Sequence, residues 1–297
     1  PGFEGKQGEV LRNMDKWNQY LFAGEHGIPM APTFLIGLDE KHVPDELEYP
    51  CIVKPRVSAL GSKSDIEICG DEAALCNTLD RFEEKGYEDA LVQVFLNKSS
   101  EACSLGCITK DGRILGGTVS KLRECLESAT SFAKIVADNS DVAPAEHADL
   151  VLVNSIVTNA LKDDGYTGQY DVDYLICEDK TFLNEINFRH SGNGYALIDD
   201  RINAPFTWAM SCLGLEDAKH EEKVKVGSYM MVELYDKMYI KRGVLTLKEW
   251  IRDIKRTDHF AVYSKDDKLM AFRTYLATAR SLFKRFVRSV KRKIKRV

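Results

Sequence analysis

The sequence predicts an α+β fold, and three observations support this prediction. Several stretches alternate polar and apolar residues, which is the pattern of half-buried strands. Other stretches repeat apolar residues at helical spacing. The two kinds of segment are mixed, without the regular strand–helix–strand order of a doubly wound sheet. The clearest strands are residues 168–174 and 182–189, which are separated by a polar turn at Glu178-Asp179-Lys180.

The expected elements follow from caps, breakers and periodicity. Asn13 or Asp15 can cap a first helix that stops at Gly27. The residues that follow are extended, because a residue before proline avoids the helical region. After that helix we predict strands at 34–37, 49–55 and 66–69, a helix from 71 to 85 and a strand at 91–96. A hairpin over 103–120 that turns at 110–112 follows, and then helices at 145–163 and 202–213.

Size and composition bound the class of protein. The chain has 297 residues, of which 44% are apolar and 29% charged, and these values are ordinary for a globular protein with a sizeable core. It has no run of 18 uncharged apolar residues and no secretory signal, so we expect no membrane span. The eight cysteines form no Cys-x-x-Cys pair, which indicates reduced thiols in a cytoplasmic protein rather than a disulfide framework or a zinc site.

Charge is unevenly distributed along the chain. The net charge is −5, yet residues 275–297 contain nine Lys or Arg and no Asp or Glu. The rest of the chain holds the other 32 of the 41 basic side chains against all 46 acidic ones, a charge of −14. We therefore expect an acidic body with a basic end. We expect no nucleic-acid partner, because the sequence has no recognition motif and the acidic body opposes binding.

The hairpin at 168–189 carries acids on one face. If its turn centres on Asp179, Asp173 lies across from Glu185 and Asp171 across from Asn187. This pairing needs a turn of odd length or a bulge, because an even, regular turn would put Asp173 and Glu185 on opposite faces. Like charges that face each other are destabilising, so we expect a bound cation. Carboxylates together with substrate phosphates suit Mg²⁺. The alternative is a solvated acidic face.

Two further segments carry groups that suit a nucleotide. Lys54 ends an apolar strand, and residues 59–64 form a small loop rich in hydroxyls, which can offer backbone N–H groups and a cation to phosphate oxygens. The strand at 91–96 runs directly into a polar connector, and the backbone groups at its end can pair with a planar base. The alternatives are a flexible turn beside a solvated lysine and a plain core strand.

Taken in chain order, these segments resemble the ATP-grasp superfamily, and most of all its carbamoyl-phosphate-synthetase-like and carboxylate–amine ligase branches. The resemblance covers roughly residues 12–215, and its most specific part is the ending at 185–189 with an acid upstream. The matching segments are Asp15-Lys16, Gly27-Ile28-Pro29, residues 49–55, Gly61-Ser62-Lys63, residues 92–96, Asp173, and Glu185, Asn187 and Arg189.

The resemblance implies a role for each matched residue. Gln93 stands where a Glu is common, which is tolerable if the backbone recognises the base. Lys54, Glu185 and Arg189 are the residues on which catalysis would depend. For the nucleotide, the implied roles are phosphate binding by Lys16 and Lys54 with Ser62 and Lys63 on a lid loop, adenine binding at Gln93, Phe95 and Leu96, and ribose binding by Glu101. For the metal, the implied ligands are Asp173, Glu185 and Asn187, with Asp171 as the alternative acid. Arg189 is implied to contact the γ-phosphate and the developing acyl phosphate.

The resemblance also implies an organisation into two α+β subdomains that hold ATP between them. The expected parts are a lead-in with the first helix (1–30), a lid subdomain (31–96), a catalytic subdomain with the metal site (97–215) and a C-terminal extension (216–297). ATP-grasp enzymes usually carry a Rossmann-like domain before the first helix, whereas this chain starts almost at that helix, with Pro1 rather than Met. We therefore expect a fragment, a processed chain, or a protein that works with a partner.

The implied activity is that of an ADP-forming ligase. Such an enzyme joins a carboxylate to an amine through an acyl phosphate, with ATP and Mg²⁺, or Mn²⁺, as cofactors. Residues 259–267 resemble the end of ATP-grasp proteins that act on cell-envelope or peptide precursors, so the expected substrate is an amino acid or such a precursor. The alternatives are an ATP-grasp kinase and a nucleotide-binding regulatory module that lacks its first domain.

The final segment, 275–297, has the pattern of a basic amphipathic helix. Its apolar residues follow 3-4 spacing and basic residues fill the other face; the apolar residues are Leu276, Ala279, Leu282, Phe283, Phe286, Val287, Val290 and Ile294. This pattern is typical of a helix that binds an anionic membrane surface, in which case the protein would be peripheral at the inner face of the membrane. The alternative is a helix packed on the core with a solvated basic face.

Overall fold

The computed structural model describes residues 2–5, 8–57, 65–124, 130–139, 145–199, 202–215, 223–277 and 280. The chain divides into two compact units. The first comprises Pro1–Leu122 and Lys134–Gly227, and the second comprises Arg123–Ala133 and Ser228–Val297. Of the predicted segments, the loop with Ser62 and Lys63 and most of 275–297 lie outside the described residues.

Most helices and strands belong to the first unit. Its helices are α1 (Glu9–Asn13), α2 (Lys16–Glu25), α3 (Glu72–Glu84), η2 (Ala145–His147), α4 (Ala148–Asp163), α5 (Tyr195–Asp199) and α6 (Ala204–Cys212). Its strands are β1 (Gly2–Phe3), β2 (Thr33–Gly37), β3 (Cys51–Lys54), β4 (Glu67–Cys69), β5 (Asp89–Val94), β6 (Ser100–Ile108), β9 (Tyr166–Cys177) and β10 (Lys180–Asn187), together with most of β7 (Ile114–Glu124) and β8 (Thr130–Asp138).

The main sheet of the first unit is built around the long strand β9. The strands follow the order β1-β9-β6-β7-β8, and β10 also pairs with β9. The pairs of β9 with β1, β6 and β10, and of β6 with β7, are antiparallel. The strands pair antiparallel, and strands and helices do not alternate regularly along the chain. Both features confirm the predicted α+β class.

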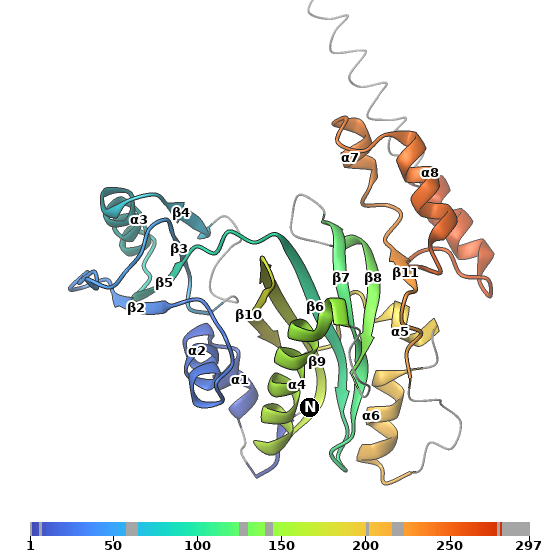
Figure 1. Cartoon of the computed structure of the whole chain (residues 1–297), viewed down its shortest axis with the longest axis horizontal. Helices are drawn as coiled ribbons and strands as arrows, with labels where there is room; N and C mark the ends of the chain where they lie inside the picture. The colour runs from blue at the N-terminus through green and yellow to red at the C-terminus, as the bar shows by residue number, and fades with distance from the viewer. Residues whose placement is uncertain are drawn as a thin grey trace, which may run out of the picture. The chain divides into compact units, whose positions relative to one another are not determined.

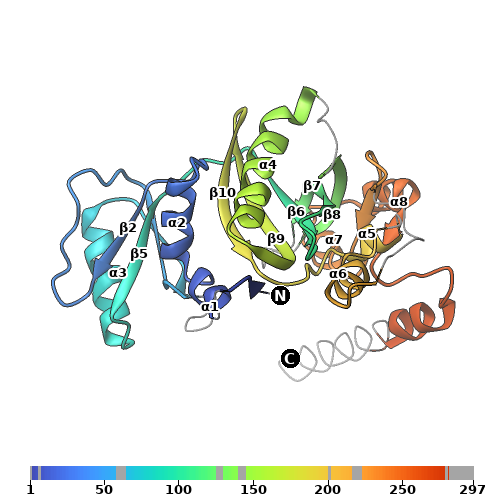
Figure 2. The same cartoon turned by 90° about the horizontal axis from the view of Figure 1, so that it is seen from below.

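Helix α4 covers one face of this sheet, as Figures 1 and 2 show. Leu150, Val153 and Val157 of α4 pack with Tyr170, Val172 and Tyr174 of β9 in one apolar core. The opposite face is partly covered by α5, whose Leu197 lies close to Gly117 of β7. Residues of β9 therefore alternate between a core under α4 and a second face that is only partly covered.

A second, smaller sheet has its own core. It has the order β2-β5-β3-β4, with every pair antiparallel, and α3 packs on β3, β4 and β5. Asp71 caps α3 by accepting the N–H of Ala74 at 2.8 Å, as its helix-start pattern requires. The core between α3 and the sheet includes Leu75, Leu79 and Phe82, and each of these is fully buried.

The second unit contains β11 (Tyr229–Met231), β12 (His259–Phe260), α7 (Lys237–Lys241) and α8 (Leu247–Arg256). It holds a buried ion cluster, in which Arg123 donates to Asp236 at 2.7 and 2.9 Å and to Asp253 at 2.9 Å. Both carboxylates are buried, so the paired guanidinium is what makes their burial tolerable. Within the described residues, no helix is long and apolar enough to cross a membrane.

Every element predicted between α2 and α4 is present in the structure, including the hairpin of β6 and β7, although the ends differ by a few residues. Strand β8 was missed by the sequence analysis. Eight of its nine residues are buried, and a strand that is buried on both faces lacks the polar–apolar alternation that identifies a half-buried one.

Candidate functional site

The acidic face of the hairpin forms as the sequence predicted. Glu185 pairs with Asp173 and Asn187 with Asp171 in the β10–β9 register. The predicted odd-length turn is wrong, because Cys177 pairs with Lys180 across the two residues Glu178 and Asp179. The register instead shifts at a bulge between Leu183 and Glu185. The extra residue returns Glu185 to the same face as Asp173, which was the alternative left open.

Strands β6 and β7 add three more side chains to this face. Cys103 of β6 pairs with Asp173, and Glu101 pairs with Lys121 of β7. The Lys121 ammonium lies 2.8 Å from Oδ1 of Asp173 and 3.1 Å from Oε2 of Glu101, and its side chain is only 8% exposed. Glu101, predicted to bind a ribose, also forms an ion pair with Lys98.

The sequence analysis missed Lys121, although a signal for it was present. The predicted β6–β7 hairpin turns at 110–112, and a turn centred on Asp111 places Lys121 opposite Glu101. The structure has this register. Pairing the predicted strands residue by residue would therefore have brought Lys121 to the acidic face.

Helix α2 carries Lys16 to the other side of the acids. Asp15 caps the helix by accepting the N–H of Trp17 at 2.9 Å, and the Lys16 ammonium lies 2.8 Å from Oε1 of Glu185. The two acids that face each other are thus each paired with a lysine, Asp173 with Lys121 and Glu185 with Lys16. These ammonium groups supply the positive charge that the facing acids require.

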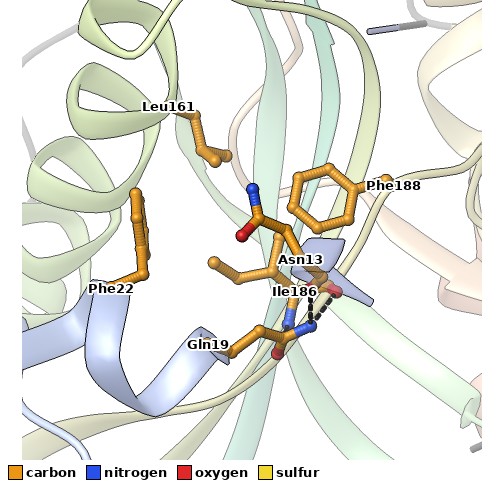
Figure 3. Close-up of a pocket in the computed structure, with 6 residues that line it drawn as sticks. All are labelled: Asn13, Gln19, Phe22, Leu161, Ile186 and Phe188. Atoms are coloured by element: carbon orange, nitrogen blue, oxygen red, sulfur yellow. Dashed lines mark hydrogen bonds between the residues drawn. The ribbon is translucent and has the colours of Figure 1, made fainter. Parts of the chain in front are cut away.

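Gln19 fixes the helix that carries Lys16. Its amide accepts the N–H of Ile186 at 2.9 Å and donates to the Ile186 carbonyl at 2.9 Å, so one side chain satisfies both backbone groups of a strand residue. Gln19 also donates to the carbonyl of Asn13 and lines a small apolar pocket with Phe22, Leu161, Ile186 and Phe188, into which the Asn13 side chain points (Figure 3). The pocket, of about 10 Å³, holds no more than one water molecule, so it is too small for a substrate, and the hydrogen bonds of Gln19 are what join α2 to β10.

Lys54 ends β3 and is buried. Its ammonium donates to Oε1 of Gln93 at 2.9 Å, and the Gln93 amide donates to Thr33 at 2.8 Å. Burial, together with the positive charge of Lys16, lowers the pKa of Lys54 to about 8, against the opposing effect of Glu185. A bound anion would stabilise the charged form of a buried lysine that lies beside a second lysine.

The strand end at 93–96 offers less free backbone than the sequence suggested. The Phe95 N–H donates to the Pro50 carbonyl at 2.9 Å, and the Leu96 carbonyl accepts the Lys98 N–H at 2.9 Å. Phe95 and Leu96 are partly exposed, whereas Gln93 is buried and bonded to Lys54 and Thr33. Base binding at this strand end stays a prediction.

Asp171 and Arg189 complete the acidic face. The Arg189 guanidinium lies 3.3 Å from Oδ2 of Asp171 and is 60% exposed. Burial raises the pKa of Asp171 to about 6, with the negative charge of Asp173 adding to the effect and Arg189, a hydrogen bond from Ser191 and Lys121 opposing it. Asn187 lies opposite Asp171 and is partly buried.

Of the three acids predicted to bind a metal, the structure brings Asp171 and Asp173 together but does not bring Glu185 into the same group. Ligand atoms of Cys103, Asp171 and Asp173 lie within 4.8 Å of one another. Burial raises the pKa of the Cys103 thiol well above its usual value, so this sulfur is a neutral, soft group that Mg²⁺ does not select. The oxygens of Asp171, Asp173 and Glu185 and the amide of Asn187 are the groups that suit Mg²⁺ or Mn²⁺.

The fold with this arrangement of strands and acids is the ATP-grasp fold, as the sequence predicted. Among solved structures, the chain is similar to the biotin carboxylase domain of 2-oxoglutarate carboxylase from Hydrogenobacter thermophilus, solved with MgADP, ADP and bicarbonate. That match has a TM-score of 0.60 and 16% identity, and covers 74% of this chain and 50% of that one.

Two carboxyaminoimidazole ribonucleotide synthases are also similar. The enzyme from Aspergillus clavatus, solved with ATP, has a TM-score of 0.59 and 19% identity, with 76% of this chain and 58% of that chain covered. The enzyme from Thermus thermophilus has a TM-score of 0.56 and 15% identity, with coverage of 73% and 56%. The chain thus spans 50 to 58% of the length of these three proteins. No protein-family model and no curated protein sequence matches the chain.

Proposed function

We propose that the chain binds Mg²⁺-ATP on the face formed by β6, β7, β9 and β10 and acts as an ADP-forming ligase. The observation that carries the proposal is that Lys16, Lys54 and Lys121 lie near the two acids that face each other, Asp173 and Glu185. Lys16 forms an ion pair with Glu185, and Lys121 forms one with Asp173. Lys54 is buried, and the positive charge of Lys16 contributes to its lowered pKa. Nucleotide phosphates and a divalent cation are the complementary pair for such a mixed site, because phosphates attract the lysines and the cation attracts the acids.

In the proposed reaction, a carboxylate oxygen of the substrate attacks the γ-phosphorus of ATP and ADP leaves. An amine nitrogen then attacks the acyl carbon, inorganic phosphate leaves, and the amine loses a proton. A bound Mg²⁺ would neutralise phosphate oxygens and hold them in line. Asp173, Glu185, Asn187 and Asp171 are the residues proposed to hold it.

The chain's own residues would act by position and charge. Lys16 and Lys54 would bind the phosphates, with Ser62 and Lys63 above them, while Gln93, Phe95, Leu96 and Glu101 would hold the nucleoside. Arg189, whose guanidinium is largely exposed, is free enough to turn toward the transferred phosphoryl group. Fixed cations of this kind stabilise the charge that develops on the acyl phosphate. As substrate class we propose an amino acid or peptide-like precursor, with the subdomains at 31–96 and 97–215 enclosing the nucleotide.

An isotope experiment separates this function from its alternatives. The chain is incubated with Mg²⁺-ATP, hydroxylamine as the amine, and a panel of ¹⁸O-labelled carboxylates that comprises amino acids, dipeptides and bicarbonate, the last because the Hydrogenobacter structure contains it. A ligase releases ADP only with both partners, forms a hydroxamate, and transfers one ¹⁸O atom from the carboxylate to inorganic phosphate. A kinase would instead form a stable phosphorylated product, and a regulatory module would bind ATP without turnover.

A further inference from the structure

The described part of the second unit includes a helix over residues 268–277, and one side of this helix packs on the unit. Ala271 is 2% exposed. The Tyr275 hydroxyl donates to Oε1 of Glu233 at 2.8 Å, and Glu233 also accepts the N–H groups of Val262 and Tyr263 at 3.1 and 3.0 Å. Because Glu233 is buried and bonded on several sides, this contact fixes which side of the helix faces the unit.

A different side of helix 268–277 is apolar and exposed. Leu269 is 58% exposed, Met270 60% and Phe272 61%. At 3.6 residues per turn, Leu269 and Phe272 lie roughly 100 to 160° around the helix axis from Ala271. They therefore lie away from the packing side, and no described residue covers them. Exposed apolar groups that lie together in this way mark an interaction site.

The charges near this side are mostly positive. Lys265, Lys268 and Arg273 are exposed. Asp266 and Asp267 precede the helix, and Asp267 caps it by accepting the Met270 N–H at 2.9 Å. Toward the C-terminus the sequence continues the spacing that begins at Leu269 and Phe272, through Leu276, and adds nine basic residues without an acid.

We propose that the exposed side of helix 268–277, defined by Leu269, Met270 and Phe272, with Arg273 among them and Lys268 at its edge, docks the protein on an anionic lipid surface. Apolar side chains enter the interface between headgroups and acyl chains, and flanking basic residues remain at the headgroups. Charge decides between partners that could cover the apolar side. A second copy docked on this side would bring Lys268 and Arg273 against the same basic residues, and nucleic acid would use the basic residues without needing the apolar ones.

Sedimentation with lipid vesicles tests this proposal on the full chain. The vesicles contain phosphatidylcholine alone or mixed with phosphatidylserine, at low and near-physiological salt. The intact protein is expected to sediment only with the phosphatidylserine vesicles, and less at higher salt. Phe272→Gln and Leu269→Gln should each lower the partition coefficient about tenfold, since each removes a large apolar group from the interface. Lys268→Glu combined with Arg273→Glu should lower it by more than about tenfold.

Matched controls separate this surface from general charge and stability effects. Leu152→Gln makes the same change at a leucine that is 60% exposed on α4, and Lys110→Glu reverses an exposed charge at the β6–β7 turn. Both should bind vesicles like the intact chain, and all variants should unfold at the same temperature because the altered side chains are exposed.

Three outcomes would overturn the proposal. The intact chain could fail to bind phosphatidylserine vesicles at low salt. Phe272→Gln could bind as tightly as Leu152→Gln, which would leave charge alone as the cause. Alternatively, the chain could form a dimer or bind a duplex oligonucleotide in a way that Phe272→Gln abolishes while vesicle binding is unchanged.

Discussion

The two faces of strand β9 differ although their residues alternate along one chain segment. Tyr170, Val172 and Tyr174 are fully buried beneath α4, in a core that is apolar except for the tyrosine hydroxyls, which are hydrogen-bonded to asparagine side chains. Asp171 and Asp173, the residues between them, lie among lysines, an arginine and a second pair of polar side chains from β10. The first face is stabilised by area removed from water, whereas the second holds charges whose arrangement costs stability unless each is paired.

A single strand can thus support folding with one face and chemistry with the other. Substitutions on the α4 side should change stability and leave the proposed turnover intact. Substitutions on the acidic side should do the reverse, because ions that face each other contribute little to the fold.

The largest effect is expected on the acidic face. Asp173→Asn and Glu185→Gln keep the shape of each side chain and remove its charge, so each should lower the rate of Mg²⁺-ATP turnover about 100-fold or more. Asp179→Asn, at the exposed turn of the same hairpin, is the control and should keep the full rate. Unchanged turnover in both site variants would contradict the assignment of this face.

On the α4 side, Val172→Ala should lower the free energy of unfolding by about 1–3 kcal/mol, since it removes buried methyl groups and leaves a cavity. Denaturant titration measures the loss. Turnover measured well below the unfolding midpoint should stay at the rate of the unaltered chain. A large loss of turnover in the folded variant would show that the two faces are not separable.

Gln19 joins the two faces, because it holds α2, and with it Lys16, against β10. Gln19→Ala leaves the buried N–H and carbonyl of Ile186 without their side-chain partner, which should cost about 1–3 kcal/mol of stability, and it should also raise the KM for ATP through the loss of a fixed Lys16. The control is Asn18→Ala, whose amide bonds to the Arg12 carbonyl within the same segment. A stability loss with an unchanged KM would limit Gln19 to a structural role.

The smallest effect concerns the pH dependence of ATP binding. Because the pKa of Lys54 is lowered to about 8, this group loses its charge as the pH rises through 8, whereas ATP phosphates favour the charged form. ATP binding should therefore take up a proton above pH 8 and weaken by up to about tenfold per pH unit. Calorimetry in buffers of different ionisation enthalpy measures the uptake. Lys54→Arg, which stays charged, should abolish it, and equal uptake in that variant would assign the proton to another group.

The sequence predicted the acids of this site better than it predicted their surroundings. Alternation at 168–174 and 182–189 placed Asp171, Asp173, Glu185 and Asn187 on one face, because side chains of a strand alternate strictly. The bulge that brings Glu185 to that face was foreseen only as an alternative to an odd turn. A single extra residue leaves no periodic signal, since it depends on what the opposing strand can accept.

Contacts between distant segments were beyond the reach of periodicity. Gln19 and Ile186 are 167 residues apart, and nothing in the α2 pattern distinguishes a glutamine that binds a strand backbone from a solvated one. The assignment of Lys54 to an apolar strand end was correct in position, but its burial and its bond to Gln93 depend on the neighbouring strand β5.

The proposal that the acidic face is the metal–nucleotide site is tested most directly by measuring how Mg²⁺ binding and ATP binding depend on each other. ATP is titrated into the unaltered chain and into the double variant Asp173→Asn/Glu185→Gln, each with and without Mg²⁺. Mg²⁺ should tighten ATP binding by about tenfold or more in the unaltered chain. It should have almost no effect in the variant, whose ATP binding without Mg²⁺ should be as tight or tighter because Lys16 has lost Glu185 and Lys121 retains only Glu101 as an acidic partner. Equal tightening by Mg²⁺ in both proteins, or no tightening in either, would contradict the assignment of the acidic face as the metal–nucleotide site.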